Sequence, residues 1–114
     1  MIASEIKKGQ SYKMVDLIDY VPEAVATRNL VQKATGHILL LAVDTGQSYI
    51  NKVSRFDIFV EILEGSAEIT IEGSVLFLET GDSIIIPAHS GKSICAVTRL
   101  KMVHSVIKSG YEDV

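Results

Sequence analysis

Residues 46–65 read GQSYINKVSRFDIFVEILEG, residues 66–80 read SAEITIEGSVLFLET, and residues 81–91 read GDSIIIPAHSG. Runs rich in β-branched and aromatic residues, which favour strands, alternate here with turns that contain glycine, which suits tight turns. Pro87 closes the last run, because proline cannot donate a hydrogen bond to a strand ladder. The stretch therefore predicts short antiparallel β-strands joined by hairpin turns.

The sequence on either side continues this pattern. Strands are predicted at residues 25–34, 36–44, 48–53, 56–63, 66–71, 74–79, 83–87, 93–98 and 100–108. The run 36–44 is apolar, which indicates a strand buried on both faces, and its flanking glycines favour a strand over a helix. Short strands with turns at a spacing of about 8–12 residues are typical of an all-β sandwich or barrel. We interpret the chain as a small β-barrel.

Length and composition fit one globular domain. The chain has 114 residues, of which 47% are hydrophobic and 22% charged, and dividing it would leave pieces too small for a core. We interpret it as an N-terminal arm at 1–13, a single barrel at 14–110 and a mobile tail at 111–114. The net charge of −3 argues against nucleic-acid binding, which requires a basic face.

Three features predict a cytoplasmic protein with no membrane segment. The single cysteine, Cys95, cannot form an internal disulfide, which indicates a reducing compartment. The N-terminal residues lack the apolar region of a secretory signal. The longest apolar run, residues 38–43, is far too short to span a bilayer.

The glycines of the central stretch follow a recognisable spacing. Gly46 is followed by five residues and then by the triplet KVS at 52–54; three residues separate this triplet from Ile58, and six separate Ile58 from Gly65. This spacing resembles the first motif of the cupin superfamily, in which a glycine, an HxH triplet, a glutamate and a second glycine occupy these places.

The second cupin motif is similar to residues 81–92. That motif consists of glycine, five residues, proline, any residue, glycine, two residues and histidine. Gly81 and Pro87 are in place, whereas His89 stands where the motif has glycine and Lys92 stands where it has histidine.

The resemblance extends over about residues 10–108 and is specific for fold. It implies a small single-domain cupin of the conserved-barrel type, with an all-β double-stranded β-helix, or jelly-roll, architecture. Such cupins commonly pair through their outer sheet faces, so the resemblance also implies a homodimer.

The resemblance does not extend to the metal ligands of cupins. Where metal-binding cupins place three histidines and a glutamate, this chain has Lys52, Ser54, Ile58 and Lys92. Imidazole and carboxylate groups bind first-row metals, whereas a protonated ammonium cannot ligate and isoleucine has no donor atom. We therefore expect no metal cofactor at the usual place, although the sequence does not exclude a divalent metal held elsewhere.

The same positions predict a pocket of different chemistry. Strand alternation places Phe56 on the inward face with Ile58, and Lys52 and Ser54 share that parity. Lys92 enters from the opposite side. The two ammonium groups, with Ser54 as a hydrogen-bond partner, favour a small anionic ligand such as a carboxylate or phosphate. Alternatively, both lysines extend past apolar walls and place their charges in water.

Two histidines are further pocket candidates. His104 alternates with apolar residues that include Met102, so both are expected to point inward. His89 is predicted to lie in the loop beside the mouth of the barrel. A lone histidine on an apolar face is usually a hydrogen-bonded core residue, and the alternative is a displaced metal site that uses both histidines.

Three functions are compatible with this sequence. The favoured one is a metal-free binding module for a small anionic ligand, with no catalytic residue assigned. The second is a cupin enzyme whose displaced metal is held by His89 and His104. The third is a structural dimer in which Phe56, Ile58 and Met102 fill a degenerate pocket.

Overall fold

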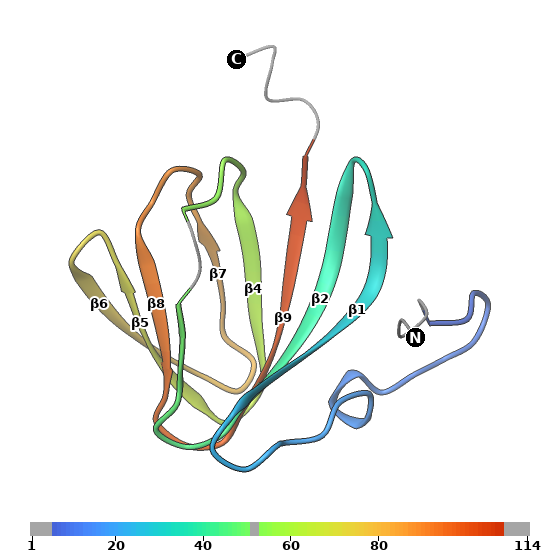
Figure 1. The fold of residues 1–114 in the computed structure, drawn as a ribbon, viewed down its shortest axis with the longest axis horizontal. Helices are drawn as coiled ribbons and strands as arrows, with labels where there is room; N and C mark the ends of the chain where they lie inside the picture. The colour runs from blue at the N-terminus through green and yellow to red at the C-terminus, as the bar shows by residue number, and fades with distance from the viewer. Residues whose placement is uncertain (1–5, 51–52, 109–114) are drawn as a thin grey trace.

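The computed structural model describes residues 6–50 and 53–108 and consists of nine strands and one helical turn in that part of the chain. The elements are η1 (Met14–Asp16), β1 (Val25–Lys33), β2 (Gly36–Val43), β3 (Ser48–Ile50), β4 (Ile58–Glu64), β5 (Ser66–Ile71), β6 (Ser74–Glu79), β7 (Ser83–Ile86), β8 (Lys92–Ala96) and β9 (Leu100–Ile107). They form two antiparallel sheets, ordered β1-β2-β9-β4-β7 and β3-β8-β5-β6. Figure 1 shows that the sheets converge at one end and separate at the other, where β4 and β8 begin. We call this second end the open end.

The all-β jelly-roll prediction is confirmed. Every predicted strand is present in the described part of the chain, and the strands at 66–71 and 74–79 have the predicted bounds. The strand predicted from residue 56 begins instead at Ile58. The Ser54 side chain accepts a hydrogen bond from the backbone nitrogen of Phe56 at 3.0 Å and donates one to its carbonyl at 2.8 Å. This local turn takes the place of strand pairing.

Strand alternation fills the space between the sheets. In β4, Ile58, Val60 and Ile62 are buried, whereas Phe59 between them is 40% exposed. The buried residues pack with apolar side chains from the opposite sheet, including Ile69 and Ile94. An interior of aliphatic side chains from both sheets therefore holds the barrel together.

The strand predicted to be buried on both faces is β2. Leu39 and Leu41 face the space between the sheets, and Leu40 and Ala42 belong to a second apolar cluster. The N-terminal segment supplies Ile18 and other apolar side chains to that second cluster. Figure 1 shows the segment running alongside β1 before it enters that strand. The continuous apolar run of β2 is thus explained by cover on both sides.

Tyr20 fastens the N-terminal segment to the end of β4. Its hydroxyl donates to Glu64 Oε2 at 2.6 Å, and its ring lies 4.9 Å from the Arg99 guanidinium and 5.1 Å from the Lys101 ammonium. Burial and the bond to Glu64 raise the pKa of the Tyr20 phenol above its ordinary value. The tyrosine therefore remains protonated and acts as a hydrogen-bond donor across the physiological range.

We expect Tyr20→Phe to lower the free energy of unfolding by about 1 kcal/mol, because the Glu64 carboxylate loses a charge-assisted hydrogen bond. Urea denaturation followed by circular dichroism measures this loss. Tyr12→Phe is the matched control, since the Tyr12 hydroxyl donates only to exposed Gln10, at 3.2 Å, and it is expected to change stability little. Equal losses in the two variants would show that the Tyr20 contact contributes nothing special.

The outer face of β4 and β7 carries exposed apolar side chains. Phe59 is paired with Ile85 across these strands, and the two are 40% and 61% exposed. A homodimer would cover such a surface, and the homodimer stays a prediction. The cytoplasmic location also stays a prediction. No helix in the described ranges is long and apolar enough to cross a membrane.

Candidate functional site

The first component of the candidate site is Lys92, at the start of β8. Lys92 has the same parity as Ile94 and Ala96, so its side chain points between the sheets, and only 7% of it is exposed. Its ammonium nitrogen is buried and has no hydrogen-bond partner among the described residues. Burial lowers the pKa of the Lys92 ammonium below its ordinary value. A buried cation without a partner is energetically costly.

The second component is His104 on β9. It pairs with Leu39 of β2 and Val60 of β4, and 3% of its side chain is exposed. Its Nε2 atom is buried and also lacks a partner in the described part of the chain. The Tyr49 ring packs edge-on against it, with 5.6 Å between ring centroids. Burial, followed by the charge of Lys92, lowers the pKa of His104 to about 3, so this imidazole is neutral at physiological pH.

The third component is His37, near the start of β2. It has the parity of the interior residue Leu39, and its cross-strand partner on β9 is Val106. Its Nδ1 atom is buried and has no partner among residues 6–50 and 53–108. Burial, followed by the charge of Lys108, lowers the pKa of His37 below its ordinary value.

A cavity of about 290 Å³ opens beside His37 at the open end of the barrel. We call it the rim cavity. Its lining residues are His37, Val53, Ser54, Arg55, Phe56, Ile58, Val106 and Lys108. None of these described lining residues is acidic, and three of them are basic. The rim cavity therefore adds positive charge beside the interior group of Lys92 and His104.

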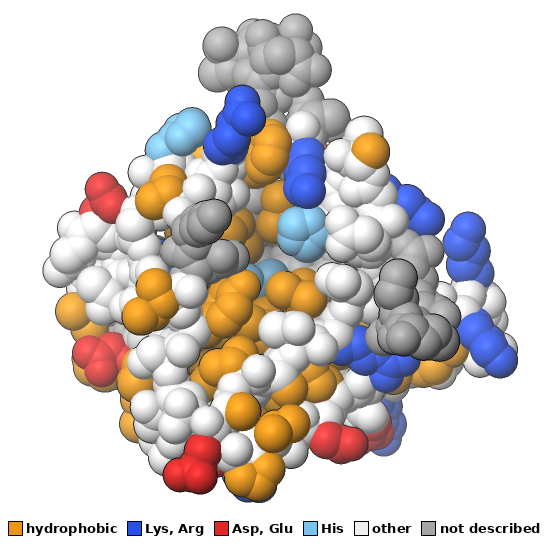
Figure 2. Space-filling model, viewed as in Figure 1, with side chains coloured by type: hydrophobic (Ala, Val, Ile, Leu, Met, Phe, Trp, Pro, Cys, Tyr) orange, Lys and Arg blue, Asp and Glu red, His pale blue; other side chains and the backbone are white. Residues whose placement is uncertain are grey.

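Figure 2 shows the types of side chain on one face of the molecule. Histidine side chains lie among hydrophobic side chains near the middle of the face, and side chains of Lys and Arg lie toward the top. Polar nitrogens in an apolar surround are poorly solvated, which strengthens any interaction they make with a ligand.

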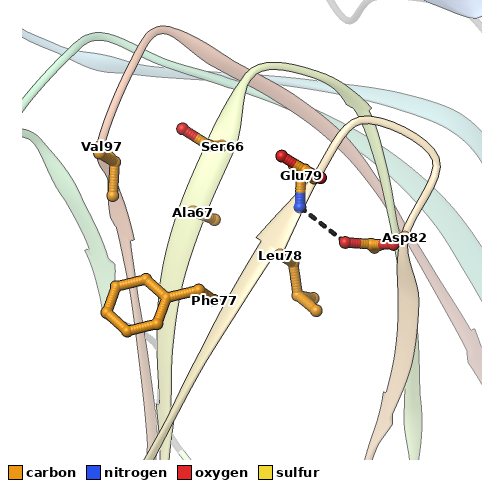
Figure 3. A pocket seen from close by; sticks show the side chains of 7 residues that line it. All are labelled: Ser66, Ala67, Phe77, Leu78, Glu79, Asp82 and Val97. Carbon is orange, nitrogen blue, oxygen red and sulfur yellow. Dashed lines mark hydrogen bonds between the residues drawn. The ribbon is translucent and has the colours of Figure 1, made fainter.

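A second cavity, of about 330 Å³, lies near the end where the sheets converge. Figure 3 shows its lining residues, Ser66, Ala67, Phe77, Leu78, Glu79, Asp82 and Val97. The Asp82 carboxylate accepts a hydrogen bond from the Glu79 backbone nitrogen at 2.9 Å and so completes the turn between β6 and β7. No described buried polar atom without a partner lies there, and we regard this cavity as a weaker candidate.

The predicted site residues divide into two groups in the structure. Lys52 lies outside the described residues. Ser54, Phe56 and Ile58 line the rim cavity, whereas Lys92 and His104 lie deeper. The hydroxyl proton of Ser54 is donated to the Phe56 carbonyl and is not available to a ligand.

Met102 and His89 have different surroundings. Met102 is fully buried within the interior apolar cluster. His89 is exposed, has a backbone φ of 65°, and its backbone nitrogen donates to the Ser54 carbonyl at 2.7 Å. In the ranges that the structure describes, no three His, Cys, Asp or Glu side chains are grouped so that they could hold a metal ion. The displaced metal site at His89 and His104 stays a prediction.

The side chains at the motif positions do not fit a divalent cation. Ile58 offers no donor atom and packs in the apolar interior, and Lys92 places an ammonium there that would repel a metal ion. Of these two side chains, only the Lys92 ammonium can donate a hydrogen bond or pair with an opposite charge.

Sequence reasoning missed three residues of the site: Tyr49, Arg55 and Lys108. Strand alternation could have identified Lys108, because it directly follows β9 and has the same parity as His104 and Val106. Tyr49 depends on the pairing of β3 with β8, which places it opposite Ile94. Arg55 lies in a loop, where strand alternation does not apply.

Comparison with solved structures decides the fold family. No protein-family model matches the chain, and a search of curated proteins gives no match. A cupin superfamily protein from Desulfitobacterium hafniense superposes with a TM-score of 0.84 over 91% of this chain and 95% of its own, at 24% identity. The chain has the cupin fold. The predicted resemblance is thus confirmed at the level of the fold.

Two other solved structures are similar to the present chain. A conserved protein of unknown function from Streptococcus pyogenes has a TM-score of 0.86 over 96% of each chain, at 26% identity. A cupin 2 conserved barrel domain protein from Leptotrichia buccalis has a TM-score of 0.86 over 96% of this chain and 54% of its own, at 20% identity. Cupin barrels carry many activities, so the function must be argued from the site.

Proposed function

We propose that this cupin barrel is a binding module for a small anionic molecule, and that Lys92 recognises the charge. The observation that carries the proposal is the buried Lys92 ammonium without a hydrogen-bond partner among the described residues. Removing an ammonium from water costs several kcal/mol unless an opposite charge compensates for it. An anion bound between the sheets supplies that charge.

His104 supports the same proposal. Its neutral imidazole offers a buried Nε2 atom that has no partner in the described part of the chain. Tyr49, whose ring packs against His104, is the register partner of Ile94. Ile94 shares the inward face of β8 with Lys92, so Lys92 and His104 belong to the same part of the interior. A neutral imidazole can donate or accept a hydrogen bond, whereas the ammonium only donates. Together they suit an anionic group such as a carboxylate.

Two residues predicted to bind the anion, Lys52 and Ser54, do not carry the proposal. Lys52 stays a prediction, because it lies outside the described residues. Ser54 holds the turn before β4 through its contacts with Phe56, so its part in the site is to shape the rim cavity. The proposal rests on Lys92 and His104.

We expect Lys92→Met to raise the free energy of unfolding of the ligand-free protein by about 1–3 kcal/mol, because methionine removes an uncompensated buried charge at similar size. The same variant is expected to lose the stabilisation that acetate or phosphate gives to the wild type. Thermal unfolding with each anion, compared with chloride at equal ionic strength, measures both effects.

Lys8→Met is the control, since Lys8 is exposed and lies in the segment before β1. It is expected to behave like the wild type with every anion. If wild type and Lys92→Met respond equally to the anions, Lys92 is not the binding group. If neither anion stabilises the wild type, these anions do not support the proposed function.

A further inference from the structure

Basic groups continue from the barrel interior to its open end. His104 and Val106 share the inward face of β9, and His37 of β2 is the register partner of Val106. His37, Val106 and Lys108 line the rim cavity, so the cavity begins two residues along β9 from His104. The series joins the buried site, on β8 and β9, to the rim cavity beside the start of β2.

The rim cavity has its own unmatched polar groups. Arg55 and Lys108 line it, and its described lining residues include no carboxylate to balance them. The His37 Nδ1 atom is buried there without a partner among the described residues. A single small anion held by Lys92 and His104 would leave the described lining of the rim cavity without an acidic group.

Hydrogen bonds hold the two basic segments of the rim in place. The Lys108 backbone nitrogen donates to the Thr35 carbonyl at 2.7 Å, which attaches the end of β9 to the turn before β2. The His89 backbone nitrogen donates to the Ser54 carbonyl at 2.7 Å, directly before Arg55. Groups that are held before binding lose less conformational entropy when a ligand arrives.

We propose that the ligand is a small organic dianion, with one acidic group held by Lys92 and His104 and the other at the rim cavity by Arg55, Lys108 and His37. This inference rests on the proposed function, because it assigns the second charge of a ligand whose first charge is bound in the interior. The rim cavity, at about 290 Å³, has room for a carboxylate or phosphate and its attached carbons. The chemical class is a short-chain dicarboxylate or a phosphorylated carboxylate.

The second acidic group is expected to raise affinity about tenfold. An ion pair with a fully exposed cation contributes little to affinity. Lys108 is half-buried and the His37 nitrogen is buried, so their hydrogen bonds to the second acidic group are less screened by water. Because both groups belong to one molecule, the second contact forms without a second loss of translational freedom.

Matched acids separate the two halves of the site. Isothermal titration at constant ionic strength compares succinate, glutarate and adipate with butyrate, valerate and hexanoate, which have the same carbon numbers but one charge. In the wild type, at least one diacid is expected to bind about tenfold more tightly than its matched monoacid. In Lys108→Met this preference is expected to shrink severalfold, with monoacid affinity unchanged, whereas Lys108→Arg keeps it.

Lys92→Met is expected to weaken diacids and monoacids together, and the exposed control Lys8→Met to weaken neither. Monoacid binding without any preference for diacids would overturn the dianion inference and leave the proposed anion site standing. An equal effect of Lys108→Met on both series would also overturn it. If no acid of either series binds, the proposed function fails, and the inference fails with it.

Discussion

The wild-type protein is expected to lose stability as the pH falls from 6.5, the ordinary pKa of histidine, to about 4. His104→Leu is expected to abolish most of this loss. In the unfolded chain, His104 binds a proton near pH 6.5, whereas in the folded barrel it does so only at about 3. Between these values the unfolded state binds more protons, so acid favours unfolding. At about 1.4 kcal/mol per pH unit, the loss by pH 4 is about 3 kcal/mol.

Among the residues that the structure describes, no acidic group acts on His104 to offset this effect. Lys92 faces it from β8, His37 from β2 and Tyr49 from β3, and its register partner on β4 is the aliphatic Val60. The pKa of His37 is also lowered by burial and by Lys108. His37 therefore contributes in the same direction as His104.

Denaturant unfolding at a series of pH values measures the difference between wild type and His104→Leu. His89→Asn is the control, because His89 is exposed and asparagine tolerates its positive φ. This control is expected to follow the wild-type pH dependence. Parallel curves for wild type and His104→Leu would mean that His104 accepts a proton in the folded state as readily as in the unfolded state.

Gly65→Ala is expected to lower the free energy of unfolding by about 3 kcal/mol, from a left-handed backbone and a forced movement of packed main chain. Gly65 lies between β4 and β5, where the chain passes from one sheet to the other, and its φ is 93°. An added β-carbon would overlap the Arg99 carbonyl oxygen and lie 2.9 Å from the carbonyl carbon. Both are backbone atoms, which cannot rotate away.

Gly73→Ala separates the two causes. Gly73 has a similar φ of 84°, but a β-carbon there would meet nothing within 4 Å. Its expected loss is about 1 kcal/mol, from backbone conformation alone. Chemical denaturation of both variants gives the contribution of the Arg99 contact by difference. Equal losses would show that the chain moves away from Arg99 at little cost.

Local sequence determined most of the architecture of this protein. The alternation of Ile58, Val60 and Ile62 with polar or exposed neighbours specified which face of β4 is buried, and the apolar run of β2 specified cover on both sides. Turn glycines such as Gly65 and Gly81 have positive φ values, a conformation that side chains disfavour. These signals are properties of one strand or one turn, and sequence displays them directly.

The start of β4 could not be predicted in the same way. The inward alternation of Phe56 with Ile58 suggested a strand from residue 56, but the Ser54 side chain binds the backbone of Phe56 instead. Hydrogen bonds from a side chain to the nearby backbone compete with strand pairing. Strand alternation does not register that competition.

The sequence alone determined that Lys92 and Ile58 stand where metal-binding cupins have ligands. It also determined that His104 has inward parity. Only the tertiary structure decided that the Lys92 ammonium and the His104 Nε2 atom are buried without described partners, and that His37 and Lys108 continue the basic series to the rim. These groups come from β2, β8, β9 and the residue that follows β9, and the strands belong to two sheets. Their proximity depends on how strands far apart in the chain pair and face each other, which no local pattern encodes.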